Sequence, residues 1–263
     1  MNIDDVKRQL PKTLQHLIDD YDWHPASEGE SDAAVFHLVG NTTSYLKVSQ
    51  VDAQFPVKTD KTKLDWLNGK IAVPKVLAYE ESTTHQYLLM SAIEGLFPFH
   101  DNLDWTVEER IICLAQAARA FHRFPIDDCP FKWGIEEQLA GVRENIGLNR
   151  VAVDMWEDEH HGKTIEQLYR ELLAAHPTNE DLVLVHGDMY PLNIHVNPST
   201  KQVNGYIDVG ACGIGDRYTD LALIAQAIGW HFDAKYIDFF FEQYGIPKDA
   251  QKIYFYQLMT EFY

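Results

Sequence analysis

The stretch LVLVHGDMYPLNIHV, residues 182–196, decides the fold. It opens with four apolar residues, which are typical of a short buried strand, and Gly187 and Pro191 then predict an irregular loop. The pattern of a strand resumes at the end of the stretch. A second strand is predicted over residues 203–207, after a turn rich in polar residues, and Asp208 ends it.

Three oxygen-bearing side chains, Asp188, Asn193 and Asp208, flank these two strands. If the strands pair antiparallel, the start of one lies beside the end of the other, so Asn193 and Asp208 become neighbours close to Asp188. An amide oxygen and a carboxylate suit Mg²⁺ that carries triphosphate oxygens. We therefore expect Asn193 and Asp208 to hold the metal, and Asp188 to orient a substrate hydroxyl and accept its proton.

Upstream of this stretch, the first 90 or so residues show mainly β-strand patterns. Short β-prone runs are separated by polar turns, while the start of the chain has apolar residues at helical spacing. The expected elements are two short helices within residues 3–17, broken near Pro11, strands over 33–39, 44–48 and 87–90, a helix over 61–67, and an extended segment over 73–77.

Helical patterns dominate after the short segment 91–95, which is suited to a linker. Thr106 and Glu109 form the sequence signature of a capping box at one helix start. Helices are expected over residues 106–124, 136–145, 165–174, 221–228 and 236–244. The predicted architecture is α+β, with a small β-rich lobe over residues 1–90, a linker over 91–95, a larger helical lobe over 96–263, and a ligand in the cleft between the lobes.

The composition fits a globular protein that meets a cationic partner. With 40 acidic and 22 basic residues, the formal charge is −18, which disfavours nucleic acid and anionic membranes. On composition alone, surface acids that only maintain solubility explain this charge better than a cationic partner does. The acidic N-terminus has no signal peptide and no apolar run is long enough to span a membrane, so we expect a cytoplasmic protein. The three cysteines are widely spaced and are expected to be reduced packing residues.

Two motifs carry a resemblance to a known family: His186-Gly187-Asp188 through Asn193, and Tyr206-Ile207-Asp208. They resemble the catalytic and metal-binding segments of aminoglycoside phosphotransferases, which are relatives of protein kinases. Further similarity to the 3′-phosphotransferase branch extends over nearly the whole chain and includes residues 66–70, 73–77, 88–91, 128–130 and 261–263. The resemblance implies a two-lobed protein-kinase-like fold, an N-terminal nucleotide-binding lobe and a C-terminal catalytic and substrate-binding lobe.

The same resemblance implies a site for ATP or GTP as phosphate donor. Lys47 corresponds to the lysine that contacts the α- and β-phosphates, and Tyr45 to the aromatic residue that stacks on adenine. Asp60 stands where the lysine's glutamate partner is usual. The turn at residues 28–31 resembles the phosphate-covering loop, with Ser31 as a contact to the β-phosphate. Backbone groups of Ser91 and Ile93 are expected to bond the purine edge.

Acidic residues are implied to bind the amino groups of the acceptor. The candidates are Asp154, Glu157, Asp158, Glu159, Glu261 and Tyr263, the last through its terminal carboxylate. A solvated loop explains the cluster at residues 154–159 equally well. The chain also departs from the 3′-branch: residues 189–192 read Met-Tyr-Pro-Leu, and Ala211 and Gln226 replace expected basic residues.

Three functions stay open at this point. The first is phosphorylation of an aminoglycoside, for example at a 3′-hydroxyl. The second is a kinase of the same fold acting on a macrolide, choline, a sugar or an amino-acid alcohol, and the third is a non-catalytic nucleotide-binding protein.

Other polar residues near the motifs are expected to have structural roles: His186, Asp216 and Asp220 should brace the loop and the helix that follow them. The pair His160-His161 lacks a third ligand at a spacing that suits a metal.

Overall fold

The computed structural model describes residues 1–26 and 33–263. Contacts within the chain group it into two compact units. Unit 1 comprises Met1–Gly95 together with Asn204–Gly210, and unit 2 comprises Leu96–Val203 together with Ala211–Tyr263. The short segment that carries Asp208 therefore belongs to the N-terminal unit, although it lies far along the chain. The sequence pattern did not predict this return of the chain to unit 1.

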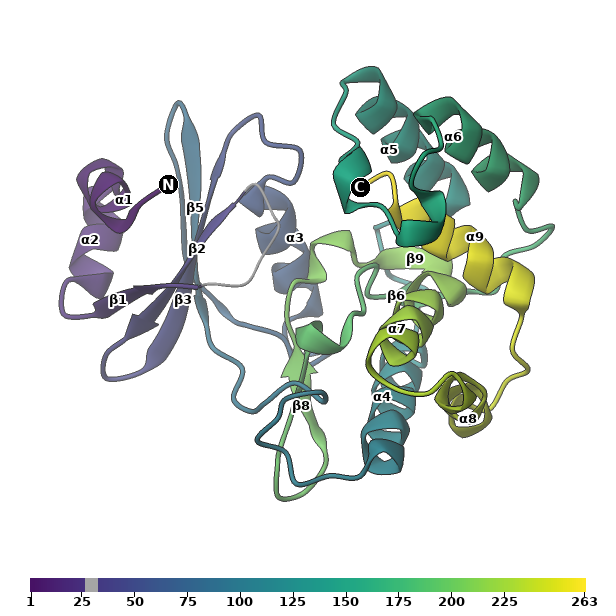
Figure 1. Ribbon diagram of the computed structural model, residues 1–263. Helices are drawn as coiled ribbons and strands as arrows, with labels where there is room; N and C mark the ends of the chain where they lie inside the picture. Colours follow the sequence, from purple (N-terminus) through teal and green to yellow (C-terminus); the bar gives the residue numbers. More distant parts are fainter. Residues whose placement is uncertain (27–32) are drawn as a thin grey trace. The chain divides into compact units, whose positions relative to one another are not determined.

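Unit 1 is built on a five-stranded antiparallel sheet in the order β1-β2-β3-β5-β4 (Figure 1). The polar turn predicted around Gly40 joins β2 to β3, which confirms the expected hairpin. The strand β1 was not predicted from the sequence. The strands are β1 (Asp22–Pro25), β2 (Ala34–Val39), β3 (Thr43–Gln50), β4 (Val76–Glu81) and β5 (His85–Ser91).

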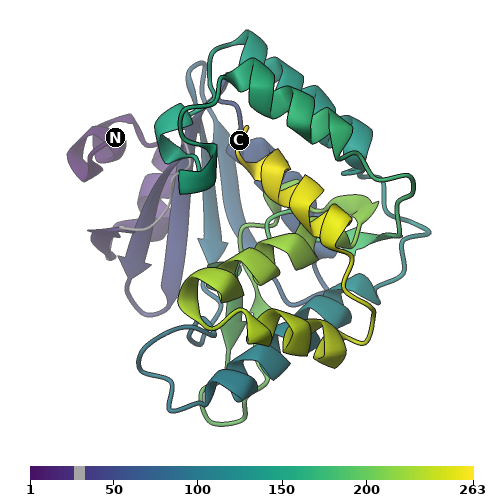
Figure 2. The same ribbon diagram turned by 45° about the vertical axis from the view of Figure 1, so that its right-hand side comes forward.

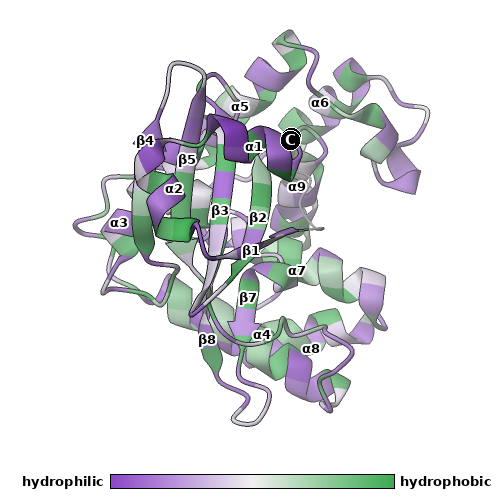
Figure 3. Cartoon of the chain, turned by 90° about the vertical axis from the view of Figure 1, so that its left-hand side faces the viewer, coloured by the Kyte–Doolittle hydropathy of each residue, from purple (hydrophilic) through white to green (hydrophobic). Residues whose placement is uncertain are grey.

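One face of this sheet packs against the two N-terminal helices, α1 (Ile3–Gln9) and α2 (Lys12–Ile18). Figure 3 shows the apolar stretches of the strands beneath these helices. The shared core consists of Val6, Leu10, Leu14, Ile18, Phe36, Leu38, Leu46, Val48, Tyr87 and Leu89. Because side chains alternate along a strand, Leu46 and Val48 point into this core and Lys47 points to the opposite face.

The helix α3 (Val57–Leu67) contacts β3, β4 and β5. It starts just after Pro56, four residues before the predicted start. A proline just before a helix is favourable because it has no N–H group to leave unsatisfied. This early start adds the turn that carries Asp60, so the helix presents this acidic residue near its N-terminus.

Unit 2 is mainly helical (Figure 2). The contacts between its helices join α4 to α8, and α7 to both α8 and α9. The helices are α4 (Val107–His122), α5 (Ile135–Gly147), α6 (Ile165–Ala174), α7 (Tyr218–His231), α8 (Lys235–Tyr244) and α9 (Ala250–Thr260). The capping box predicted at Thr106 and Glu109 is present at the start of α4.

Short strands and 3-10 turns connect these helices. The strands β6 (Leu182–Val185) and β9 (Gly213–Asp216) pair antiparallel, and β7 (Ile194–Val196) forms a second small sheet with β8 (Val203–Tyr206). Two 3-10 turns, η1 (Val153–Met155) and η2 (Asp158–His160), lie between α5 and α6, and a third, η3 (Pro191–Asn193), precedes β7. Cys113, Cys129 and Cys212 form no disulfide, and Cys113 and Cys212 are buried. In the part of the chain that the structure describes, no helix is long and apolar enough to cross a membrane.

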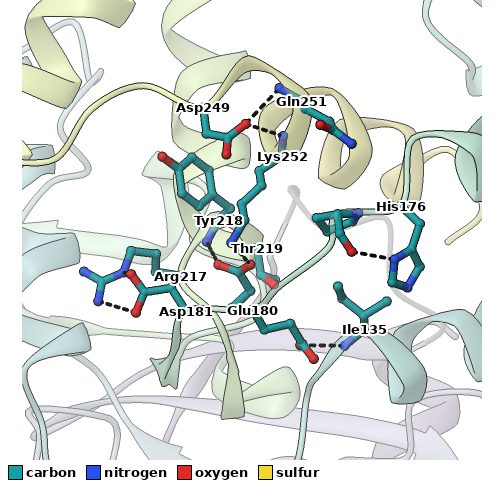
Figure 4. Close-up of polar contacts among 12 residues, drawn as sticks. Ile135, His176, Glu180, Asp181, Arg217, Tyr218, Thr219, Asp249, Gln251 and Lys252 are labelled. Atoms are coloured by element: carbon teal, nitrogen blue, oxygen red, sulfur yellow. Dashed lines mark hydrogen bonds and ion pairs between the residues drawn. The ribbon is translucent and has the colours of Figure 1, made fainter.

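A buried ion pair joins the end of β9 to α9 (Figure 4). Lys252 Nζ lies 2.6 Å from Asp216 Oδ2, and both side chains are almost fully buried. Burial raises the pKa of Asp216, and the bond from Lys252 opposes this rise. The backbone N–H of Tyr218 also donates to Asp216. The expected bracing role of Asp216 is therefore confirmed.

Replacing Lys252 by methionine should lower the free energy of unfolding by about 3 kcal/mol or more, because the carboxylate of Asp216 stays buried without its cation. Urea unfolding followed by circular dichroism measures the change. The matched control is Lys248→Met, which removes the exposed pair with Asp238 and should cost about 1 kcal/mol or less. Equal effects of the two substitutions would contradict a special role of the buried pair.

Candidate functional site

A buried lysine bridges two carboxylates in unit 1. Lys47 Nζ on β3 lies 3.0 Å from Asp60 Oδ2 on α3 and 2.5 Å from Asp208 Oδ1 on the returning segment. The lysine side chain is 11% exposed and that of Asp60 is 17% exposed, whereas Asp208 is 44% exposed. Asp208 therefore keeps part of its side chain exposed to solvent while Lys47 bonds its Oδ1.

The charge of Lys47 is stabilised by these partners. Burial alone favours the neutral amine, but the two carboxylates outweigh burial and raise the pKa of Lys47. Burial also raises the pKa of Asp60, with Lys47 opposing the rise and Asp208 adding to it. Lys47 is consequently a fixed cation that can contact a negatively charged group.

The backbone brings Asp208 to the lysine through contacts within unit 1. Tyr206 N donates to the carbonyl of Ala72, and Asn204 Nδ2 donates to the carbonyl of Glu94. Asp208 itself has a positive φ of 56°, an uncommon conformation for a residue with a side chain. Such conformations cost free energy and are found preferentially at functional sites. Two residues on, a Cβ atom at Gly210 would collide with Oδ1 of Asp60, so a larger residue there would displace the carboxylate that pairs with Lys47.

In unit 2, Asn193 holds the carboxylate of Asp188. Its Nδ2 donates to Asp188 Oδ2 and to the Asp188 backbone carbonyl, both at 2.9 Å. Since the amide nitrogen makes these bonds, the amide oxygen of Asn193 is the atom suited to a cation. Asp188 lies in the loop between β6 and η3, at the end of a buried strand, as the apolar run 182–185 predicted.

Asp220 on α7 fixes the loop that carries Asp188. The fully buried carboxylate of Asp220 accepts from the backbone N–H groups of His186 and Gly187 at 2.8 and 2.9 Å, and also contacts His122 Nε2 at 2.9 Å. His122 continues the network to the hydroxyl of Tyr244. The bracing role expected for Asp220 is confirmed. The sequence did not indicate His122 or Tyr244, because nothing local marks a buried histidine as a partner of a residue 98 positions away.

Gly187 is required by the loop conformation. Its φ is +86°, and a Cβ atom there would press against the backbone carbonyl of Ala211. His186 is fully buried, and its Nδ1 lies 3.3 Å from the backbone nitrogen of Asp188. Its position matches the structural role expected from the sequence.

The donor set for a metal is an amide oxygen and a carboxylate oxygen, which fits Mg²⁺. Asn193 belongs to unit 2 and Asp208 to unit 1, so their predicted meeting around one cation stays a prediction. Among residues 1–26 and 33–263, no three or more His, Cys, Asp or Glu side chains are grouped to hold a metal ion. The pair His160-His161 therefore gains no support as a metal site.

Two of the residues expected to bind the nucleotide base, Tyr45 and Ser91, lie on the sheet of unit 1. Tyr45 is half-buried and stacks on His37, with ring centroids 5.0 Å apart. The N–H of Ser91 donates to the carbonyl of Lys75, so this N–H is already bonded within unit 1. Ile93 lies two residues farther along, in the linker. Ser31 and the turn at residues 28–31 lie outside the described residues.

The acidic cluster of unit 2 divides into partly buried and exposed members. The carboxylate of Glu261 accepts from the backbone N–H of Glu157 at 3.3 Å, and its backbone carbonyl accepts from Trp156 Nε1 at 2.8 Å. Gln226 on α7 donates to Glu157 at 3.2 Å. Asp154, Asp158 and Glu159 are exposed, which agrees with the alternative of a solvated loop. The hydroxyl of Tyr263 donates to the carbonyl of Gln138 at 2.7 Å.

Glu261 has the most altered carboxyl group of this cluster. Burial, followed by the charges of Glu157 and Glu159, raises the pKa of Glu261 to about 7, although the N–H of Glu157 opposes the rise. His160 Nε2 lies 3.8 Å away, but burial and the nearby Lys163 lower the pKa of His160. A neutral imidazole offers no charge to Glu261, so an external cation would stabilise its carboxylate.

Comparison with known proteins gives concordant results. Residues 22–256 match the model of a family described as phosphotransferase enzymes. An aminoglycoside 3′-phosphotransferase of Streptomyces fradiae is 33% identical over 95% of this chain and 98% of the relative. Another, from Enterococcus faecalis, is also 33% identical, over 98% of this chain and the full length of the relative.

Solved structures agree with these sequence relatives. The crystal structure of an aminoglycoside-3′-phosphotransferase of type VIII has a TM-score of 0.86 and 28% identity, and covers 99% of each chain. An aminoglycoside phosphotransferase of Streptomyces rimosus in complex with ADP and streptomycin has a TM-score of 0.81 and 25% identity, and covers 98% of each chain. The predicted α+β kinase-like fold is thereby confirmed.

Proposed function

This chain belongs to the phosphotransferase enzyme family, and we propose that it moves the γ-phosphate of ATP or GTP to a hydroxyl of an aminoglycoside. The 3′-hydroxyl is the proposed acceptor atom, because the relatives from Streptomyces fradiae and Enterococcus faecalis are named for that position. The reaction would inactivate the antibiotic and give resistance. We propose the cytoplasm as its place, since the donor nucleotides are abundant there.

The observation that carries the proposal is the Asp188–Asn193 pair on a braced loop. Asp188 is held by two bonds from Asn193, and the loop amides on its N-terminal side are fixed by buried Asp220. A carboxylate with a fixed direction suits orientation of a hydroxyl group and acceptance of its proton. Such geometry fits an enzyme better than a non-catalytic nucleotide-binding protein, which does not need an oriented base.

In the proposed reaction, the acceptor oxygen forms a bond to the γ-phosphorus while the bond from phosphorus to the β–γ bridging oxygen breaks. The proton of the acceptor hydroxyl passes to Asp188. The nucleoside diphosphate leaves with the electrons of the broken bond. Lys47, which is charged throughout, would neutralise the α- and β-phosphates.

We propose that Asn193 and Asp208 hold Mg²⁺ through the amide oxygen of Asn193 and the carboxylate of Asp208. Bound there, Mg²⁺ would neutralise triphosphate charge. Asp60 keeps Lys47 in place through their ion pair. For the base, we propose stacking on Tyr45, polar bonds from the backbone of Ser91 and Ile93, and a contact from Ser31 to the β-phosphate.

The acceptor is proposed to bind through its ammonium groups to the acidic cluster of unit 2. Glu157 and Glu261 are the members held in defined positions. Asp154, Asp158 and Glu159 would add weaker, solvent-screened attraction, and Tyr263 is proposed as a further contact. A second candidate, a kinase for another small alcohol, is kept because Tyr190, Ala211 and Gln226 depart from the 3′-branch pattern.

The test is release of nucleoside diphosphate by the purified protein with Mg²⁺ and ATP or GTP. The acceptors to compare are kanamycin, neomycin, a macrolide, choline and simple sugars. Turnover with the aminoglycosides alone is expected. Turnover with choline, a sugar or a macrolide instead would replace the proposed acceptor and keep the kinase chemistry, and no turnover with any acceptor would contradict the proposal.

The affinity for an aminoglycoside should rise with pH through the pKa of Glu261. Below pH 7 this carboxyl group is mostly protonated and attracts a cation poorly, whereas above pH 7 it is ionised. The KM for kanamycin should therefore fall several-fold more steeply between pH 6 and pH 8 in the wild type than in Glu261→Gln. Comparing the two proteins removes the titration of the antibiotic itself. Parallel profiles would exclude Glu261 as an acceptor contact.

The same raised pKa affects folding in the opposite direction. Because the folded-state pKa of Glu261 lies above its ordinary value of 4.5, the neutral form favours the fold, and this contribution is present below pH 4.5 and is lost as the pH rises through about 7. Affinity for the acceptor should therefore increase over a pH range in which this residue stabilises the fold less.

A further inference from the structure

Two aromatic side chains meet beside the loop that carries Asp188. Tyr190 follows Asp188 by two residues and is half-buried, and Trp230 lies at the C-terminal end of α7 with 54% of its surface exposed. Their ring centroids are 6.1 Å apart and the planes are tilted by 51°. The tilt means that the rings do not cover each other's faces, so a flat apolar surface of Trp230 is open to a ligand.

This aromatic pair is joined to the partly buried members of the acidic cluster. Gln226 and Trp230 are four residues apart on α7 and therefore share one face of the helix. Gln226 donates to Glu157. Burial, followed by the charge of Glu157, raises the pKa of Tyr190, which shows that this carboxylate also acts on the tyrosine. Tyr190, Trp230, Gln226 and Glu157 therefore form one continuous surface in unit 2.

The end of α7 that carries Trp230 is itself fixed by aromatic contacts. Phe99 makes edge contacts with His231 and Phe232, at centroid distances of 5.1 and 4.9 Å. Neither the fold nor this packing needs Trp230 to be a large exposed aromatic residue. A tryptophan face at a rigid helix end, one helical turn from a residue that bonds a carboxylate, has the chemistry of a binding surface for an apolar ring with a cationic substituent.

We propose that Tyr190 and Trp230 form an aromatic platform that receives one ring of an amino-sugar acceptor, with an ammonium group of that ring directed to Glu157. This inference rests on the proposed function and names the group that sets its acceptor specificity. A saturated sugar ring has an apolar C–H face that fits an aromatic surface. More than one carboxylate near the platform, Glu157 and Glu261, favours an acceptor with several ammonium groups over a single quaternary ammonium.

Steady-state kinetics of the Mg²⁺-supplied enzyme with kanamycin test the platform. Trp230→Ala and Tyr190→Ala should each raise the KM for kanamycin by about 3- to 30-fold. The KM for ATP should change less than about 2-fold, and Trp230→Phe should restore most of the affinity because it keeps an aromatic face. The matched control is Tyr254→Ala, which removes an exposed aromatic residue from α9 of the same unit and should leave all constants unchanged.

A direct contact measurement separates this inference from the proposed function. In protein labelled with 5-fluorotryptophan, the fluorine resonance of Trp230 is assigned by its loss in Trp230→Phe. Titration with kanamycin should shift this resonance to saturation, and choline should not. A saturating shift without turnover of any aminoglycoside would reject the proposed reaction and keep the platform.

Four results would overturn the platform. The first three are turnover of kanamycin with an unchanged KM in Trp230→Ala and Tyr190→Ala, an unshifted Trp230 resonance at saturating kanamycin, and a shift with choline alone. The third of these would identify a quaternary-ammonium site instead. An equal loss of affinity in Tyr254→Ala would also overturn it, since the effect would then not belong to this surface.

Discussion

Asp188→Asn should lower kcat by about 10³-fold, which corresponds to about 4 kcal/mol of transition-state stabilisation. The substitution keeps the size of the side chain and its contact with Asn193, but an amide cannot accept the proton of the acceptor hydroxyl. Nucleotide affinity should change little, because Lys47, Asp60 and Asp208 hold their own ion pairs in unit 1. Measurement of kcat together with ATP binding by titration calorimetry distinguishes the two effects.

Asp127→Asn provides the control for this substitution. Asp127 is an exposed residue of unit 2, and its replacement should leave kcat within about 2-fold of the wild type. Substantial activity in Asp188→Asn, within about 10-fold of the wild type, would remove Asp188 from the mechanism. A loss of ATP affinity equal to the loss of kcat would instead indicate that the substitution disturbs the nucleotide site.

Asp208→Asn should lower kcat/KM for ATP by about 10²-fold or more and raise the Mg²⁺ concentration that supports half-maximal activity. The substitution removes the partly exposed carboxylate proposed to hold the metal, and it also takes one counter-charge from Lys47. Activity measured against free Mg²⁺ at fixed ATP reports the metal requirement. Asp60 still raises the pKa of Lys47 in this variant, so the lysine remains charged.

The control for Asp208 is Asp65→Asn on α3. Asp65 pairs with Lys61 four residues earlier, at 2.7 Å, and its side chain is 48% exposed, similar to Asp208. This exposed pair should contribute about 0.5 kcal/mol and have no influence on Mg²⁺ dependence. An unchanged Mg²⁺ requirement in Asp208→Asn would exclude it as a metal ligand.

Much of the secondary structure could be predicted from local pattern. The helix α6 has the predicted bounds, and the hairpin of β2 and β3 lies where its polar turn indicated. The helix α9 was not predicted. It buries Lys252, Phe255, Tyr256, Leu258 and Met259, and residues buried on several sides of a helix do not leave the one-sided apolar pattern that marks an amphipathic helix.

The sequence by itself determined the fold class and the residues proposed for chemistry. Strand, loop and metal-type residues follow one another within residues 182–208, and short-range propensity and residue chemistry are enough to recognise such a segment. Only the tertiary structure decided which groups act on them: Asp208 on Lys47, Asp220 on the loop before Asp188, and Trp230 on Tyr190. These partners are separated by tens of residues or more, and their contacts form because apolar burial packs the elements that carry them, which no local pattern encodes.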